Sequence, residues 1–350
     1  MQLDVLSRHL PQAQGTAAGR VLRATTQGLL DEGCDVRVTS WSPEPPVEEL
    51  PTWCEWRPLP PERAWRSRGR ALLRPRSDVV RLGWSPRGTA VADDPLSAPA
   101  LPAGGVATLH YATALDLRAL GRRPSPHDVQ DLRAERRLRG TRLLAYSERV
   151  AAWCGGTDVP VAVEVPGEPL PLVDEPVAGL IADWTWEPNR VALGALLRVW
   201  PQVRAAVPSA RLEVSGRGAG EAGAVEGVTV LGEVAQSCDA LERLALLAFP
   251  CPATSGPKVK VLEAAALGVP VLTTRAGVEG LRTSSIPVTT SDGFADAMVG
   301  LLRDPARRAE LAARARADLL GTHAPRPAAR ARLAALAGRE QRQQERREAE

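Results

Sequence analysis

Residues 244–274, LALLAFPCPATSGPKVKVLEAAALGVPVLTT, hold the pattern that decides the fold. An apolar run at 244–250 predicts a buried strand, the Ser-Gly-Pro turn after it leads into an Ala-rich helix, and a second apolar strand is predicted at 269–274. Parallel strands need a crossover connection of this kind, whereas antiparallel strands can be joined by a short hairpin. The stretch therefore predicts a parallel sheet with helices on its faces.

The same alternation of strand, loop and helix extends in both directions from this stretch. Behind it, helices are predicted at about 305–320 and up to 337; before it, strands are predicted at 177–184, 210–218 and 227–234, with helices at 189–207 and 239–244. The first half repeats the pattern, with strands at 2–6, 34–40, 105–111, 141–147 and 159–166 and helices at 15–30, 127–139 and after 148. We expect an α/β protein made of two doubly wound, Rossmann-like domains.

The expected domain boundaries follow from the length and from one Pro-rich segment. With 350 residues, the chain is too long for the usual single domain and suits two of about 150 residues each. We expect an N-terminal domain over 1–168, a linker over 169–176 and a second domain over 177–322. A C-terminal helix over 323–338 is expected to cross back to the first domain, and 339–350, with almost no apolar residues, to be a disordered tail.

Composition excludes several classes of protein. The chain has 44 basic and 41 acidic side chains, and its net charge of +3 is too small to favour nucleic acid as a partner. Its five cysteines are scattered without a Cys-x-x-Cys pair, so we expect neither a disulfide framework nor a metal site. The N-terminus lacks the pattern of a signal peptide, and no apolar run approaches the ~18 residues of a membrane-spanning helix. We expect a cytoplasmic protein.

The distribution of basic residues singles out one segment. The only two lysines of the chain are Lys258 and Lys260, which leaves 44 − 2 = 42 basic residues as arginine. In a sequence so rich in arginine, the two retained lysines indicate a need for a compact ammonium group in place of a planar guanidinium. Chance is the alternative interpretation.

The position of these lysines predicts an anion site. Both lie where the Ser-Gly-Pro turn enters the helix, and the first backbone N–H groups of a helix favour a negatively charged ligand. Glu263 is three residues after Lys260 and shares its face of the helix. A diphosphate beside Lys260, with a ribose diol held by Glu263, fits this arrangement. A solvated lysine paired with a glutamate is the alternative.

Three further segments are candidates for the site. The glycine turn at 214–220, with Gly216 and Arg217, follows a strand and lets the backbone approach a nucleotide closely. Gly15 lies in the loop 8–20 between the first strand and the first helix, and His110 ends the strand at 105–111. Each has a structural alternative: an exposed loop arginine, an ordinary loop and a structural histidine.

Residues 177–282 resemble the donor-binding half of the group 1, or family 4, glycosyltransferases. The resemblance rests on LIADWTWEPNRVALGALLRVWPQVRAAVPSARLEVSGRG (180–218), GVTVLGEV (227–234) and SGPKVKVLEAAALGVPVLTTRAGVEGL (255–281). It is similar to a branch with a W-x-P-N signature, matched by Trp186, Pro188 and Asn189. The first half resembles the family only in outline. The resemblance implies the GT-B fold, with two domains facing across a cleft, and a retaining transfer that needs no metal or other cofactor.

The resemblance also assigns roles to single residues. It implies that Lys260 contacts the diphosphate of a UDP- or GDP-linked sugar, that Glu263 holds the ribose and that Lys258 is a second basic contact. Many members have a glutamate near the transferred sugar where this chain has Ser255, so sugar recognition is expected to use the backbone around this residue. The full set of expected donor-binding residues is Gly15, Gly216, Arg217, Ser255, Gly256, Pro257, Lys258, Lys260, Val261, Leu262 and Glu263, with Arg190 and Trp186 as further candidates and His110 and Lys260 as catalytic residues.

The expected function is transfer of a hexose to an acceptor that the sequence does not identify. A glycan, a lipid-linked sugar and a small-molecule aglycone all remain open, in glycoconjugate or natural-product biosynthesis. Two other functions fit the same architecture, a sugar-nucleotide epimerase and a non-catalytic binding or scaffold protein. The Arg-rich segment 61–82 suggests a basic amphipathic surface for peripheral contact with the inner membrane face, with a solvated face as the alternative.

Overall fold

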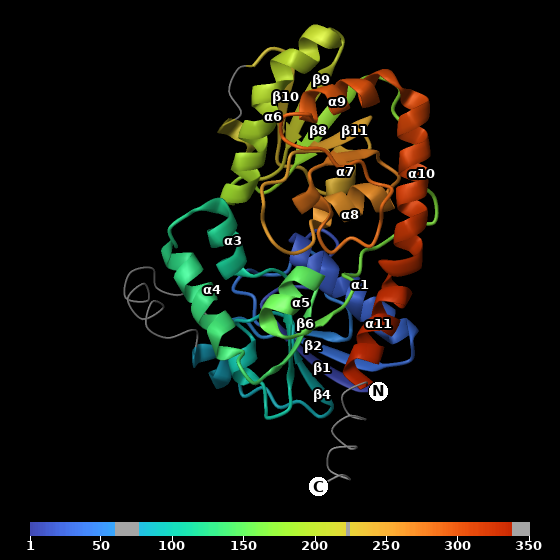
Figure 1. The fold of residues 1–350 in the computed structure, drawn as a ribbon. Coiled ribbons are helices and arrows are strands. Elements are labelled where there is room, and N and C mark those ends of the chain that lie inside the picture. The colour runs from blue at the N-terminus through green and yellow to red at the C-terminus, as the bar shows by residue number, and fades with distance from the viewer. Residues whose placement is uncertain (60–76, 222–224, 338–350) are drawn as a thin grey trace. The chain divides into compact units, whose positions relative to one another are not determined.

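The computed structural model describes residues 1–59, 77–221 and 225–337 and divides the chain into two compact units (Figure 1). The first unit contains residues 1–162 and takes up the chain again from His323; the second unit contains residues 163–322. Most of the Arg-rich segment 61–82 and the whole tail after 337 lie outside the described residues. Within the described part, no helix is both long and apolar enough to cross a membrane.

The first unit contains a parallel sheet that, over the described residues, has seven strands in the order β3-β2-β1-β4-β5-β6-β7. The strands are β1 (Gln2–Ser7), β2 (Asp35–Ser40), β3 (Cys54–Trp56), β4 (Thr89–Ala92), β5 (Val106–Leu109), β6 (Arg142–Ala145) and β7 (Thr157–Asp158). The helices are α1 (Ala17–Asp31), α3 (Thr113–Leu120), α4 (Pro126–Arg137), α5 (Glu148–Cys154) and α11 (Pro325–Ala337). β1 is an interior strand, and the chain adds β2 and β3 on one side of it and β4 to β7 on the other.

Local sequence explains why β1 and α1 form. Leu3, Val5 and Leu6 of β1 are almost fully buried, as expected for a central parallel strand with both faces covered. Thr16 then caps α1, because its side-chain oxygen accepts a hydrogen bond from the backbone N–H of Gly19 at 3.2 Å. The short polar loop between β1 and α1 is therefore held at both ends, by a buried strand and by a capped helix.

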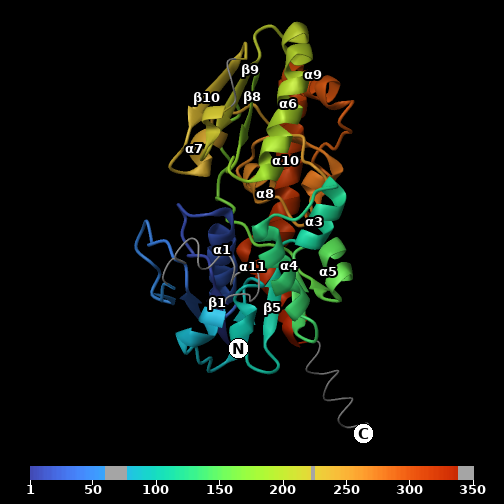
Figure 2. The ribbon, with the colours of Figure 1, turned by 90° about the vertical axis from the view of Figure 1, so that its left-hand side faces the viewer.

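The second unit contains a smaller parallel sheet in the order β10-β9-β8-β11-β12, of which β8, β9 and β10 can be followed in Figure 2. Its strands are β8 (Val177–Ile181), β9 (Arg211–Ser215), β10 (Val228–Gly232), β11 (Leu246–Phe249) and β12 (Val271–Thr273). Its helices are α6 (Glu187–Ala206), α7 (Ser237–Leu241), α8 (Val259–Ala266), α9 (Phe294–Arg303) and α10 (Pro305–Thr322). The fold class predicted from the sequence, two doubly wound α/β domains, is confirmed.

One predicted strand is wrong. Residues 159–166 form no strand, and β7 ends at Asp158. The apolar run is nevertheless buried, because Ala162 packs in a small cluster with Ala24 of α1 and Ala328 of α11. The carbonyl of Val161 lies 2.8 Å from Nδ1 of His323. A side chain therefore takes the place of the backbone group that a neighbouring strand would have offered this carbonyl. The apolar pattern of 159–166 indicates a buried segment, and the segment is indeed buried. It is covered by α1 and α11, however, and is not paired as a strand.

Helix α11 packs along α1 although the two lie at opposite ends of the chain (Figure 1). Gly28 of α1 makes the closest approach, and a Cβ atom added there would lie 2.0 Å from the carbonyl oxygen of Pro325. We expect Gly28→Ala to destabilise the first unit by roughly 1–3 kcal/mol, because backbone has to shift to admit the methyl group. Thermal unfolding followed by calorimetry measures this change.

A matched control for this substitution is Gly300→Ala in α9. An added Cβ atom at Gly300 meets nothing within 4 Å. The same change is therefore expected to stabilise the protein by roughly 0.5–1 kcal/mol, because alanine is the better helix former. A neutral or stabilising effect of Gly28→Ala would contradict the close packing of α1 on α11.

Candidate functional site

The loops that follow β8 and β11 lie where ligands bind in open α/β sheets. β8 pairs with β9 on one side and with β11 on the other, so the direction in which strands are added reverses between β8 and β11. In open α/β sheets, ligands bind beyond the carboxyl ends of the strands at such a switch point. The segments that leave these two ends are 182–186 and 250–258. They include two of the segments singled out in the sequence.

Lys260 lies at the second position of α8, at this switch point. Its Nζ donates a hydrogen bond of 2.6 Å to Oδ1 of Asn189 and lies 4.4 Å from the centre of the Phe249 ring. Burial lowers the pKa of Lys260 to about 8. The ammonium is thus held between an amide oxygen and an aromatic face at the end of β11, as a desolvated cation suited to an anionic ligand.

The W-x-P-N segment has a structural explanation at this point. Trp186 has extended backbone and caps α6, Pro188 lies in the first turn, and Asn189 follows it with a side chain that is 4% exposed. Nδ2 of Asn189 donates to the backbone carbonyl of Asp183 at 2.7 Å, which leaves Oδ1 for Lys260. The Trp186 side chain is 46% exposed. The motif therefore connects the end of β8 to the lysine of α8.

Lys258 has a different environment from Lys260. It is buried, and its Nζ donates to the backbone carbonyls of Thr254 at 3.3 Å, Ser255 at 3.1 Å and Gly256. A lysine ammonium has three N–H bonds, so these acceptors occupy all of them. In this structure Lys258 holds the loop that precedes α8, and a phosphate contact would require it to leave that loop.

The same loop is fixed from a second direction. Gly256 has a φ of +74°, a conformation that favours glycine, and its backbone N–H donates to Oε1 of Glu279 at 2.9 Å. Ser255 is 5% exposed and Pro257 precedes the Lys258 cap of α8. The backbone expected to recognise the sugar is therefore held in place by a carboxylate, Glu279, that sequence reasoning missed.

Arg217 and Asp183 form an ion pair at the neighbouring strand ends. Burial opposes the negative charge, but hydrogen bonds from Arg217 and from Thr185 lower the pKa of Asp183. Gly216 allows this approach, because it has a φ of +113° and a Cβ atom there would lie 2.0 Å from the carbonyl oxygen of Ala182. The glycine turn predicted from the sequence thus lies against the loop after β8.

The other predicted residues of this unit fall into two groups. Arg190 donates to the carbonyls of Trp184 at 2.9 Å and Thr185 at 2.8 Å, so it stabilises the loop after β8. On α8, Glu263 is 9% exposed and follows Lys260 by one turn, as expected. The side chains of Val261 and Leu262 are fully buried in the core, and their backbone N–H groups bond to the carbonyl of Lys258. These two residues hold α8 in place.

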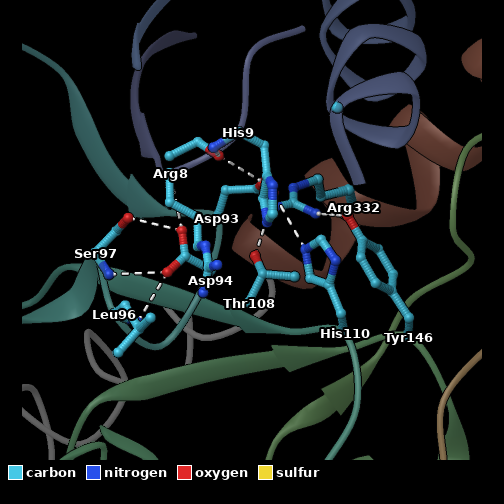
Figure 3. Close-up of polar contacts among 12 residues, drawn as sticks. Arg8, His9, Asp93, Asp94, Leu96, Ser97, Thr108, His110, Tyr146 and Arg332 are labelled. Atoms are coloured by element: carbon cyan, nitrogen blue, oxygen red, sulfur yellow. Dashed lines mark hydrogen bonds and ion pairs between the residues drawn. The ribbon is translucent and has the colours of Figure 1, made fainter. Parts of the chain in front are cut away.

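The first unit carries a second polar cluster, at the switch point of its own sheet (Figure 3). Its members follow three strands: His9 comes after β1, Asp93 and Asp94 come after β4, and His110 comes after β5. Asp94 holds the first loop in place, since Oδ2 accepts the backbone N–H of Arg8 at 3.0 Å. Gly15, further along this loop, offers its carbonyl to Arg20 at 2.7 Å.

Asp93 and His110 form a buried pair in this cluster. Nε2 of His110 lies 3.6 Å from Oδ1 of Asp93, and Ser7 donates to Oδ2 of the same carboxylate at 3.1 Å. Burial alone would lower the pKa of His110 and raise that of Asp93, but their interaction outweighs burial, so the pKa of His110 is raised and that of Asp93 is lowered. The imidazolium form of His110 is therefore favoured, and its side chain is 19% exposed.

Tyr146 and Arg332 support this pair. The ring of Tyr146 meets that of His110 edge to face, with centres 5.0 Å apart. Arg332, a buried residue of α11, donates to Thr108 Oγ1 at 2.7 Å and to the Tyr146 hydroxyl at 3.3 Å. Figure 3 shows these side chains converging from β5, the end of β6 and α11. Sequence reasoning named His110 in this cluster and missed its neighbours His9, Asp93, Asp94, Tyr146 and Arg332.

His9 stacks on His110 with ring centres 6.3 Å apart, and burial lowers its pKa from 6.5 to about 4. Between pH 6.5 and 4 the unfolded chain therefore binds a proton at His9 that the folded first unit does not bind, so this residue lowers the free energy of unfolding as the pH falls through that window. We expect His9→Gln to remove this part of the acid sensitivity. Hydrogen exchange of β1 at pH 4.5 and 7 measures it; the same loss of protection in both proteins would contradict the assignment.

One comparison with known proteins matches a segment of the second unit alone. Residues 175–304 match the model of a family described as glycosyl transferases group 1. The matched segment contains β8 to β12 and the whole Lys260 site. No curated protein sequence matches the chain.

Solved structures extend the comparison to both units. TarM superposes with a TM-score of 0.72 at 9% identity, over 96% of this chain and 98% of the other. WaaG, a glycosyltransferase involved in lipopolysaccharide biosynthesis, has a TM-score of 0.66 at 15% identity, over 97% of this chain and 100% of the other. The chain has the GT-B fold. At these identities the likeness shows the fold and nothing finer.

Two further GT-B structures contain ligands. Anabaena HepE, in complex with UDP and glucose, has a TM-score of 0.65 at 14% identity, over 96% of this chain and 99% of the other. A mutant of S. aureus TarM, in complex with fondaparinux, alpha-GlcNAc-glycerol and UDP, has a TM-score of 0.59 at 14% identity. That match covers 71% of this chain and spans about half of the other, 55% of its length.

Proposed function

We propose that the chain is a glycosyltransferase that moves a hexose from a UDP- or GDP-linked sugar to an acceptor. The observation that supports this most directly is Lys260, a desolvated cation at the second position of α8 and at the switch point of the second sheet. A diphosphate is the anion that such a helix start and lysine bind well. The family match over 175–304 and the UDP complexes of GT-B structures support the same donor class.

We propose the following roles within the donor site. Lys260 neutralises the charge that grows on the departing diphosphate, Glu263 holds the ribose, and the backbone of 255–257 recognises the sugar. Lys258 and Glu279 support this loop through the contacts described above. The bond between the anomeric carbon and the diphosphate breaks as the bond to the acceptor oxygen forms, and the proton of the acceptor hydroxyl passes to the departing diphosphate. This is electrostatic stabilisation of a leaving group.

In the first unit, we propose that the imidazolium of His110 donates a hydrogen bond to the reacting sugar, with Asp93 holding its charge and orientation. Transfer with retention at the anomeric carbon, without a metal ion or cofactor, is our proposal on the strength of the family resemblance. We place the reaction in the cytoplasm, as the scattered cysteines suggested. The acceptor is a glycan, a lipid-linked sugar or a small-molecule aglycone.

Calorimetric titration with UDP, GDP, ADP and TDP, followed by hydrolysis assays on the matching sugar nucleotides, tests the proposal. We expect micromolar binding of UDP or GDP and slow release of sugar from the corresponding donor. Conversion of the donor to a different sugar nucleotide without an acceptor would identify an epimerase. A folded protein that binds none of the four nucleotides would overturn the proposed donor site.

A further inference from the structure

Asn189 fixes the position of the Lys260 ammonium. Its buried side chain is oriented by the hydrogen bond from Nδ2 to the carbonyl of Asp183, 2.7 Å away. Because the donor end of the amide is engaged by backbone beyond β8, the acceptor end faces α8. There Oδ1 accepts from Nζ of Lys260 at 2.6 Å. A contact between α6 and α8 is thus built from one amide and one amine.

The remaining surroundings of Nζ are defined by one ring and several charges. The Phe249 ring covers one side at 4.4 Å. Burial is the main reason that the pKa of Lys260 falls to about 8, and the charge of Lys258 acts in the same direction, whereas the carboxylates of Glu263 and Asp183 favour the charged form. Over the described residues, Asn189 provides the hydrogen-bond acceptor for this ammonium. Two of its three N–H bonds are left for a ligand.

We propose that Asn189 is a positioning residue: by taking one N–H of Lys260, it directs the other two toward phosphate oxygens beyond the carboxyl ends of β8 and β11. The identity of the ligand rests on the proposed function, whereas the hydrogen bond between Asn189 and Lys260 is independent of it. In this proposal Asn189 acts on the ligand through the lysine alone.

The two lysines of the chain make a direct measurement possible. Labelling with lysine that carries 13C at Cε gives two side-chain NMR signals, and a pH titration reports the pKa of each amine. In the free protein, Asn189→Ala is expected to lower the pKa of Lys260, because the ammonium loses its acceptor. Asn189→Asp is expected to raise it, because a carboxylate replaces the amide. The Lys258 signal is the internal control, since its acceptors are loop carbonyls.

Thr185→Ala is the matched control variant. Thr185 lies in the same loop and donates to Oδ1 of Asp183 at 2.6 Å, without a bond to Lys260. We expect its Lys260 titration to match that of the unmodified protein. If Asn189→Ala leaves the Lys260 titration unchanged, or if the Ala and Asp variants shift it in the same direction, the proposal is overturned. Should the Asp variant fail to fold, the Ala variant alone still decides it.

Titration with UDP and GDP then tests the consequence for the ligand. Both Asn189 variants are expected to weaken nucleotide binding about tenfold, since hydrogen bonds to charged groups contribute roughly that factor or more. General disorder of the loop would not shift the pKa of Lys260 in opposite directions in the two variants. Opposite shifts together with the same loss of affinity would therefore support the positioning role of Asn189. Unchanged affinity in both variants would overturn the proposal. If the unmodified protein binds no nucleotide, the proposed function fails while the NMR result on Asn189 stands.

Discussion

Replacing Lys260 with alanine is expected to reduce the rate of sugar transfer about 100-fold or more, because the substitution removes a desolvated positive charge from the developing diphosphate. Nucleotide affinity should fall roughly 10- to 100-fold, as expected for loss of hydrogen bonds to a charged group. Steady-state kinetics with saturating acceptor and calorimetry with the nucleotide measure the two effects.

Two controls make the Lys260 result specific. Lys260→Arg keeps the charge but should restore little activity, because the planar guanidinium cannot occupy the site between the Asn189 oxygen and the Phe249 ring in the same way. Arg307→Ala removes a positive charge from the surface of the same unit, where Arg307 pairs with Glu310, and should have no effect on transfer. Full activity in Lys260→Ala would contradict the proposed donor site.

The second large effect is expected at Asp93. Asp93→Asn removes the charge that raises the pKa of His110, and burial then favours the neutral imidazole. We expect transfer at pH 7.5 to fall by about 100-fold, the effect typical of losing one preorganised hydrogen-bond donor to the reacting group. Because lower pH restores the imidazolium, the loss should be smaller at pH 6. A pH profile of kcat/KM for the two proteins measures this.

A double-mutant cycle separates this effect from general damage to the first unit. If Asp93 acts through His110, the pair Asp93→Asn and His110→Gln should be no less active than His110→Gln alone. The profile of His110→Gln should also lack the pH dependence that appears in Asp93→Asn. Additive losses, or a loss in Asp93→Asn that is the same at every pH, would show that Asp93 supports the fold and not the histidine.

The sequence was most informative where strand, turn and helix follow one another within a short stretch. β11, α8 and β12 lie where the pattern of 244–274 predicted them, and the parallel sheet follows from that connection. β4 was not predicted, although VADD at its end carries a signal: an apolar run that stops at two carboxylates. Because that strand was missed, the first sheet's switch point and Asp93 were missed with it.

Contacts between distant segments were harder to predict for a physical reason. The partner of Lys260 is Asn189, 71 residues earlier, and Arg332 reaches Thr108 from a helix 224 residues later. Local patterns define which helix forms and which face is buried, but not which polar atom on another helix lies opposite. Asn189 belongs to a signature visible in the sequence, but its role depends on a hydrogen bond between the first turns of α6 and α8.

The environments of the two lysines have a consequence for covalent chemistry. Amine-reactive electrophiles require the neutral amine, and side-chain amines occur at two positions of this chain. Lys258 is buried with its N–H bonds engaged by loop carbonyls, whereas the pKa of Lys260, about 8, leaves roughly a tenth of its amine neutral at pH 7. A lysine-directed inhibitor would therefore find its most reactive side-chain amine at the second switch point, on a surface otherwise supplied with unreactive arginines.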